Sequence, residues 1–182
     1  MPHTESTFDR PPTFDRARCR YERDGRAVVL FSHHHAIHLT RLFQESPISD
    51  GPGILRRTAE RIFRPILEQE LANAGAASPA DRWEACRSYW AWCGLGNLSS
   101  ADPEADPVRV EMARSQLDEG WLRAWGNSAE PINHLARGYL AAAWAAMQGA
   151  TPGAYEVDEI ESLAAGRPRS VFLIRRGTLE GA

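Results

Sequence analysis

The chain has 182 residues, of which 43% are hydrophobic and 25% are charged, a composition typical of one soluble globular domain. Its net charge of −3 provides no extended basic face, which argues against a nucleic-acid partner. No apolar run approaches the ~20 residues that a membrane span requires, so no membrane partner is expected. Three cysteines without CxxC spacing argue against a disulfide framework and favour a reducing cytoplasm.

The first 17 residues predict a flexible N-terminal arm, followed by a single domain over residues 18–182. The arm is polar, contains Pro11-Pro12 and lacks an apolar signal-peptide core. It repeats the unit Thr-Phe-Asp-Arg, which places Phe8 and Phe14 in an otherwise polar stretch. Such phenylalanines would dock either on the body of the same chain or on a partner subunit. In the second case the protein would be a homodimer. The alternative is that the arm is a disordered tail.

The remaining chain alternates helical periodicity with short apolar runs. Turn signals and β-branched residues predict strands at 26–31, 108–111, 155–163 and 170–175. Apolar residues at three- and four-residue steps predict helices at 33–44, 54–74, 79–93, 117–125 and 131–148. Pro65 lies inside the second helix and is expected to kink or split it.

This order of elements favours an α+β fold. Helices alternate with isolated strands, and the last two strands surround a turn at Gly166. The economical arrangement is one antiparallel sheet with helices packed on one face and a C-terminal β-hairpin.

The spacing of residues in the last third of the chain indicates a family. From about Val108 to Arg175 the sequence resembles the 4-vinyl reductase-type small-molecule-binding domain and the related sensory domains of phenol- and xylene-responsive transcription activators. Their pattern is Pro-x-Cys-x4-Gly-Tyr, followed by Glu-x2-Cys-x3-Gly-x3-Cys. The corresponding positions in this chain are Pro131, Asn133, Gly138, Tyr139, Glu159, Ser162, Gly166 and Ser170.

The resemblance also identifies a departure from the family. In the sensory domains the Glu and the three Cys of the pattern bind a structural zinc ion. Here Glu159 is retained, whereas Asn133, Ser162 and Ser170 replace the cysteines. Because amides and hydroxyls are poor zinc ligands, the sequence predicts no zinc there. We expect these three side chains to hydrogen-bond one another and to tie the hairpin to the helix. The ATPase and DNA-binding domains of those activators have no counterpart here, so a stand-alone module is expected.

A histidine-rich string, residues 33–38, opens the first predicted helix. His34 and His38 lie one turn apart and would bind a transition metal if His134 or a carboxylate from the sheet supplied a third ligand. Ligation of haem by one of these histidines is a further option. The alternative is an exposed, polar first helical turn.

The chain contains six tryptophans, whose side chains could line an apolar pocket. Trp83 and Trp90 share a helix face at seven-residue spacing, and the alternative is that such residues form core only. The resemblance favours a pocket for a small, largely apolar or aromatic organic ligand, reached through the loops at 46–53 and 94–107. The expected wall residues are Trp83, Trp90, His134, Tyr139 and Trp144.

An enzyme that uses the same pocket in a biosynthetic pathway is the alternative function. His134 and Glu159 would act as acid and base, or the histidine string would hold a metal. Glu159 and Glu161 would share a strand face, although a solvated edge or pairing with hairpin arginines would also explain them. No nicotinamide or flavin motif supports reduction.

Overall fold

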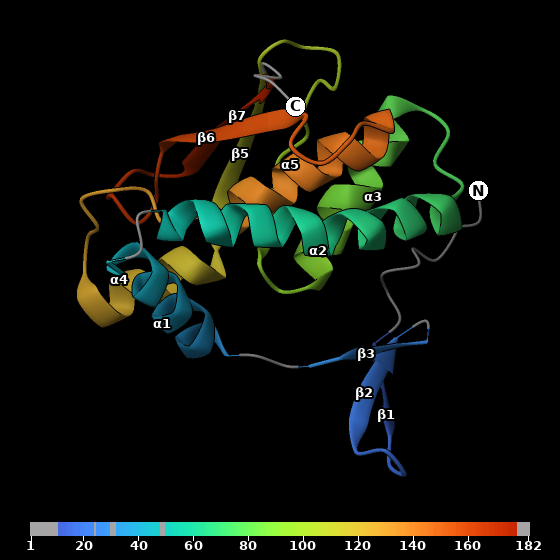
Figure 1. The fold of residues 1–182 in the computed structure, drawn as a ribbon, viewed down its shortest axis with the longest axis horizontal. Helices are drawn as coiled ribbons and strands as arrows, with labels where there is room; N and C mark the ends of the chain where they lie inside the picture. Colours follow the sequence, from blue (N-terminus) through green and yellow to red (C-terminus); the bar gives the residue numbers. More distant parts are fainter. Residues whose placement is uncertain (1–10, 24, 30–31, 48–49, 178–182) are drawn as a thin grey trace.

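The computed structural model describes residues 11–23, 25–29, 32–47 and 50–177. Within these ranges it contains five helices and two antiparallel sheets, which confirms the predicted α+β class. None of the described helices is both long and apolar enough to cross a membrane. The larger sheet and the helices form a body, and the smaller sheet stands apart from it (Figure 1).

The smaller sheet consists of three short strands near the N-terminus, in the order β1 (Thr13–Asp15), β2 (Arg20–Arg23) and β3 (Arg26–Val28). Part of the predicted arm is therefore a strand, while Phe8 lies outside the described residues. Arg23 connects this sheet to the body. Its side chain is buried, its Nη2 lies 3.9 Å from Glu70 Oε2, and its guanidinium stacks 3.8 Å from the centroid of the Trp92 ring.

The helices follow the predicted periodicity. The second helix begins at Gly51 instead of the expected Ile54, because Asp50 caps it. Asp50 Oδ1 accepts a hydrogen bond from the backbone N–H of Gly53 at 2.9 Å. It runs through Pro65 as one continuous helix, so the predicted split does not occur. Ser78 caps the third helix in a capping box with Asp81, and Pro79 follows at the start of the helix. The helices are α1 (His33–Gln44), α2 (Gly51–Ala74), α3 (Pro79–Trp92), α4 (Gln116–Trp125) and α5 (His134–Gln148).

The larger sheet has the strand order β4-β5-β7-β6. Its strands are β4 (Gly96–Leu98), β5 (Val108–Ser115), β6 (Tyr155–Glu161) and β7 (Ser170–Arg176). The register pairs Val110 with Phe172, and both side chains are buried. β4 was not predicted, because three residues carry no measurable alternation.

The helices form two layers on one face of this sheet. α5 contacts β6 and β7, and α2 packs along α5 on the side away from the sheet (Figure 1). Gly138 allows this close approach, since a Cβ there would lie 2.2 Å from the backbone oxygen of Arg56 and 2.6 Å from Ala59 Cβ. The glycine of the resembled pattern is thus needed for helix packing.

Candidate functional site

Four of the five expected wall residues come together in the core. Trp83 and Trp90 project from α3, and Tyr139 and Trp144 project from α5; we call these four residues the aromatic cluster. Ring centroids lie 4.8 Å apart for Trp83 and Trp144, and 4.6 Å apart for Trp90 and Tyr139. Phe63 of α2 adds an edge-on contact to Tyr139 at 4.9 Å. The cluster lies where a pocket between helices and sheet was expected, and its rings pack directly against one another.

The polar groups of Trp83, Trp90 and Tyr139 differ in whether they have a hydrogen-bond acceptor. Trp83 Nε1 donates to the Ser99 carbonyl at 3.2 Å, and Tyr139 Oη donates to the Cys86 carbonyl at 2.5 Å. Trp90 Nε1 is buried and has no hydrogen-bond acceptor among the described residues. A buried donor of this kind costs about 1–3 kcal/mol. The Trp90 indole N–H is therefore the unsatisfied polar group of the cluster.

Ionisation is suppressed in this part of the core. Burial raises the pKa of the Cys86 thiol to about 12 and raises the pKa of the Tyr139 phenol well above its usual range. Both groups remain neutral at physiological pH, so the cluster presents an apolar, uncharged environment.

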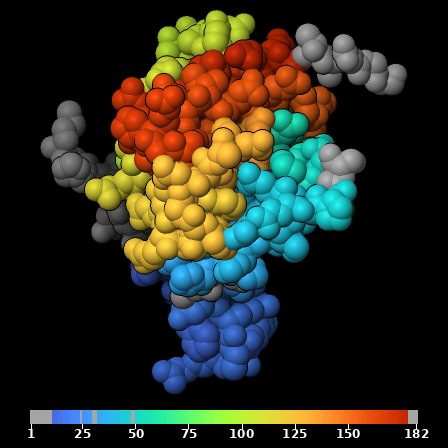
Figure 2. All heavy atoms as spheres, turned by 90° about the vertical axis from the view of Figure 1, so that its left-hand side faces the viewer, coloured from blue at the N-terminus to red at the C-terminus, as the bar shows by residue number. Residues whose placement is uncertain are grey.

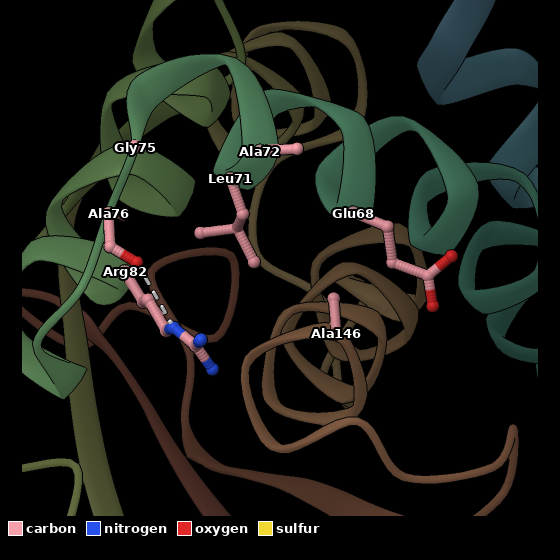
Figure 3. Close-up of a pocket in the computed structure, with 7 residues that line it drawn as sticks. All are labelled: Glu68, Leu71, Ala72, Gly75, Ala76, Arg82 and Ala146. Carbon is pink, nitrogen blue, oxygen red and sulfur yellow. Dashed lines mark hydrogen bonds between the residues drawn. The ribbon is translucent and has the colours of Figure 1, made fainter.

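The hollows found on the described surface lie outside the aromatic cluster. One, of about 350 Å³, opens between the end of α2, the start of α3 and the end of α5 (Figure 3). Leu71 forms part of its lining, and Arg82 projects into it while donating to the carbonyls of Ala76 and Met147 at 3.3 and 2.5 Å. None of the four cluster residues lines this hollow.

The two expected access loops occupy different places. The loop at 94–107 carries β4 and Ser99, whose carbonyl accepts the hydrogen bond from Trp83, so it lies directly over the aromatic cluster. Of the expected loop at 46–53, residues 51–53 form the first turn of α2, and residues 48 and 49 lie outside the described residues.

His134, the fifth expected wall residue, is the first residue of α5 and lies outside the aromatic cluster. Its side chain is buried, and neither ring nitrogen has a hydrogen-bond partner among the described residues. Burial, reinforced by the nearby charges of Arg137 and Arg56, lowers the pKa of His134 to about 4. The imidazole is therefore neutral at physiological pH.

The positions that correspond to the zinc ligands of the resembled domains do converge. Asn133 Nδ2 donates to Glu159 Oε1 at 2.8 Å, and its backbone N–H donates to Glu159 Oε2 at 3.1 Å. Ser170 Oγ donates to the same Glu159 Oε1 at 2.9 Å and accepts from the Leu163 N–H at 3.0 Å. Asn133 Nδ2 also lies 3.4 Å from Ser170 Oγ. As expected, these side chains tie the hairpin to the start of α5.

Ser162 takes a smaller part in this network than expected. Its hydroxyl is buried and has no hydrogen-bond partner of ordinary geometry among the described residues, although it lies near enough to favour the charged form of Glu159. Among these positions, the expected bonding between Asn133 and Ser170 is observed, with Glu159 as the shared acceptor.

Asp118 is a further member of the network that the sequence did not indicate. Its Oδ2 accepts from Asn133 Nδ2 at 2.9 Å, and its Oδ1 accepts from the Ala164 N–H at 2.9 Å. Ser115 caps α4 by accepting from the Asp118 N–H, and its Oγ lies 3.4 Å from Asn133 Oδ1. The pattern Ser-x-x-Asp signals a helix cap, but not that the carboxylate would reach a hairpin 46 residues away.

The carboxylate network, Asp118 and Glu159 with Asn133, Ser115 and Ser170, holds two buried acids around one amide. Burial raises the pKa of Asp118, and hydrogen bonds from Ser115 and Asn133 oppose this effect. Burial also raises the pKa of Glu159, opposed by Asn133 and reinforced by the charge of Asp118. Asn133 donates to both carboxylates through one NH2 group, so these side chains hold α4, α5 and the hairpin together.

The histidines of α1 are mostly exposed. His34, His35 and His38 face solvent, while His33 is half-buried beside α4. His38 contacts the Trp125 ring edge-on at 5.1 Å. Within the described ranges, no three His, Cys, Asp or Glu side chains gather as a metal site would require. Metal binding by His34 and His38 stays a prediction.

The acidic residues of β6 face different environments. A register shift between Glu159 and Glu161 interrupts the alternation, and Glu159 is buried while Glu161 is partly exposed. Asp158 pairs with Arg175 across the hairpin at 2.9 Å and with Arg137 at 3.5 Å. Pairing with an arginine of the hairpin therefore explains part of this acidic strand.

Comparisons with known proteins found similar solved structures only. No family model and no curated protein sequence matches the chain. The phenol-responsive sensory domain of the transcription activator PoxR matches with a TM-score of 0.74 at 15% identity, over 91% of this chain and 84% of that chain. A vinyl-4-reductase family protein from Methanocaldococcus jannaschii matches with a TM-score of 0.50 at 14% identity, over 85% of this chain and 100% of that chain. The resemblance seen in the sequence is thus confirmed at the level of the fold.

Proposed function

We propose that this chain is a binding domain for a small, largely apolar or aromatic organic molecule that enters the aromatic cluster and accepts a hydrogen bond from Trp90 Nε1. The observation that carries the proposal is the buried, unpartnered indole N–H of Trp90 within a group of aromatic rings. Pockets of this type combine apolar walls with a few polar groups that fix the orientation of the ligand. The phenol-responsive function of the PoxR domain, which has the same fold, supports a phenol-like ligand.

Binding requires the aromatic cluster to open. The rings of Trp90 and Tyr139 are in contact, so a ligand binds a minor, opened arrangement of the cluster. The apparent affinity is then the intrinsic affinity reduced by the population of that opened state. The loop at 94–107 is the proposed entrance, because its Ser99 carbonyl holds Trp83 and can release it.

A set of matched ligands and variants tests the proposal. Phenol has a hydroxyl oxygen that accepts from Trp90, whereas toluene has the same ring without an acceptor. Loss of one buried hydrogen bond lowers affinity about tenfold. Trp90→Phe should therefore weaken phenol about tenfold relative to toluene. Because Trp90 is fully buried, the smaller ring also leaves a cavity and should lower the melting temperature, so the ratio of the two affinities is the measured quantity. Trp92→Phe is the control, because Trp92 belongs neither to the aromatic cluster nor to the lining of the surface hollows. Equal phenol affinity in wild type and Trp90→Phe, or no binding of either ligand, would contradict the proposal.

Catalysis with His134 and Glu159 is the second candidate, supported by the raised pKa of a buried carboxyl. Glu159 nevertheless uses both oxygens to accept hydrogen bonds from Asn133. Turnover of a bound ligand that is lost in both His134→Phe and Glu159→Gln, with binding retained, would favour this candidate.

A homodimer that uses the N-terminal segment is also proposed. Phe14 is exposed on β1, in contact with the Tyr21 ring at 5.0 Å, and thus available to a partner. Deletion of residues 1–17 should convert the dimer to a monomer in light scattering. A full chain that is monomeric contradicts this part of the proposal.

A further inference from the structure

A second hollow lies on the face formed by α1 and α4, away from the aromatic cluster. It has a volume of about 300 Å³. Figure 2 looks toward this side of the molecule, where α1 and α4 lie next to each other. The residues that line it are Arg41, Gln44, Glu45, Trp121, Trp125, Asn127, Ser128, Ala129 and Glu130.

The apolar part of this hollow is aromatic. Trp121 and Trp125 meet edge to face with centroids 4.7 Å apart. Arg41 covers one face of Trp125, with its Cζ 4.6 Å from the ring centroid, and His38 contacts the same ring edge-on. Paired indole rings on a concave surface favour a flat, aromatic ligand.

The polar part of the hollow contains both donors and acceptors, and two of its acceptor groups, Gln44 Oε1 and the Glu130 carboxylate, matter for the ligand. Gln44 Oε1 is buried and has no donor among the described residues. The charge of Arg41 is offset by Glu45, whose Oε1 lies 2.7 Å from Arg41 Nε. Glu130 is exposed and forms no ion pair within the part of the chain that the structure describes. Because the charges of Arg41 and Glu45 offset each other, the net charge of the lining is the negative charge of Glu130. The Gln44 amide oxygen is its unpartnered acceptor.

We propose that this hollow binds a protonated aromatic amine, whose ring packs against Trp121 and Trp125 and whose ammonium group donates to Gln44 Oε1 and faces the Glu130 carboxylate. An ammonium group has three donors and no acceptor, which matches a lining that lacks donors for Gln44 and a counter-charge for Glu130. A carboxylate ligand would instead leave Gln44 unpartnered and face Glu130 with like charge. The site is independent of the aromatic cluster.

Three probes that share a ring and differ in the attached group test this chemistry. Benzylammonium carries the positive charge and the donors, benzyl alcohol carries one donor without charge, and benzoate carries a negative charge. Titration followed by the indole N–H signals of Trp121 and Trp125 in an NMR spectrum should give the tightest binding for benzylammonium and the weakest for benzoate. Phenol should move the Trp90 signal at lower concentrations than it moves these two signals, which separates this site from the proposed core site.

Two variants identify the partners. Gln44→Met should weaken both benzylammonium and benzyl alcohol about tenfold, since it removes the buried acceptor while retaining volume. Glu130→Gln should weaken benzylammonium alone. Gln148→Met, at an exposed glutamine of α5, is the control and should change neither. The proposal is overturned if benzoate binds as tightly as benzylammonium, if Gln44→Met binds like wild type, or if no probe moves the two indole signals.

Discussion

Replacement of Asn133 by alanine should destabilise the protein strongly, because this amide serves two buried carboxylates. Its Nδ2 donates to Asp118 at 2.9 Å and to Glu159 at 2.8 Å, and the residue is fully buried. A hydrogen bond to a charged group contributes about 1.5–3 kcal/mol. Two such bonds predict a loss of roughly 3–6 kcal/mol in the free energy of unfolding, with the lower end expected if water enters the space.

The assay is urea denaturation followed by tryptophan fluorescence, with the dependence on urea concentration checked for two-state behaviour. Asn127→Ala is the matched control. Asn127 is exposed, so its loss should change the free energy of unfolding by less than about 0.5 kcal/mol.

A second variant, Asn133→Asp, tests the sign of the electrostatics. It adds a third acid to a site where burial already raises the pKa of Asp118 and Glu159. Acids whose pKa is raised on folding stabilise the protein below their unfolded pKa and lose that contribution as pH rises through the folded value. Asn133→Asp should therefore be far less stable than wild type at pH 7 and should recover as the pH is lowered. The reasoning is refuted if Asn133→Ala costs less than about 1 kcal/mol, or if Asn133→Asp matches wild type at neutral pH.

Three other predictions concern stability and metal. The pKa of His134 is lowered to about 4 from 6.5, so its contribution to the free energy of unfolding, complete above pH 6.5, should be lost as the pH falls toward 4. Subtracting the pH profile of His134→Phe from that of wild type isolates this slope; a flat difference would contradict it. Gly138→Ala should destabilise by about 1–3 kcal/mol or more in thermal denaturation, since the new Cβ meets the Arg56 carbonyl; unchanged stability would exclude the close packing of α2 on α5. If the histidines of α1 bind a transition metal, metal analysis of untagged protein should find a stoichiometric ion that is lost in His34→Ala and His38→Ala, whereas metal-free wild type rejects that site.

The sequence predicted the body of the fold because its elements are long and periodic. The helical period of α2 and the Ser-Pro start of α3 suffice to place these helices. β3 lies within the strand predicted at 26–31, whereas β1, β2 and β4 have three or four residues each, too few for alternation to appear. α2 continues through Pro65 and packs along α5, and the local rule for proline does not take such tertiary packing into account.

The candidate site was predicted in its residue types and in some of its contacts. The spacing of Asn133, Glu159 and Ser170 indicated that they meet, because the family pattern fixes their positions. The part played by Asp118 depends on contacts with residues distant in sequence, and sequence cannot reveal which of several tryptophans lacks a partner. The structure locates hydrogen-bond acceptors for Trp83 and Tyr139 and finds none for the Trp90 indole N–H among the described residues.

Titration of the protein with phenol while the indole N–H signals of its six tryptophans are recorded by NMR tests the central claim most directly. The signal that disappears in Trp90→Phe identifies the Trp90 indole. The account predicts that this signal moves furthest and shifts downfield, since a free N–H becomes a hydrogen-bond donor to the ligand. A Trp90 signal that stays fixed through saturation with phenol would contradict it.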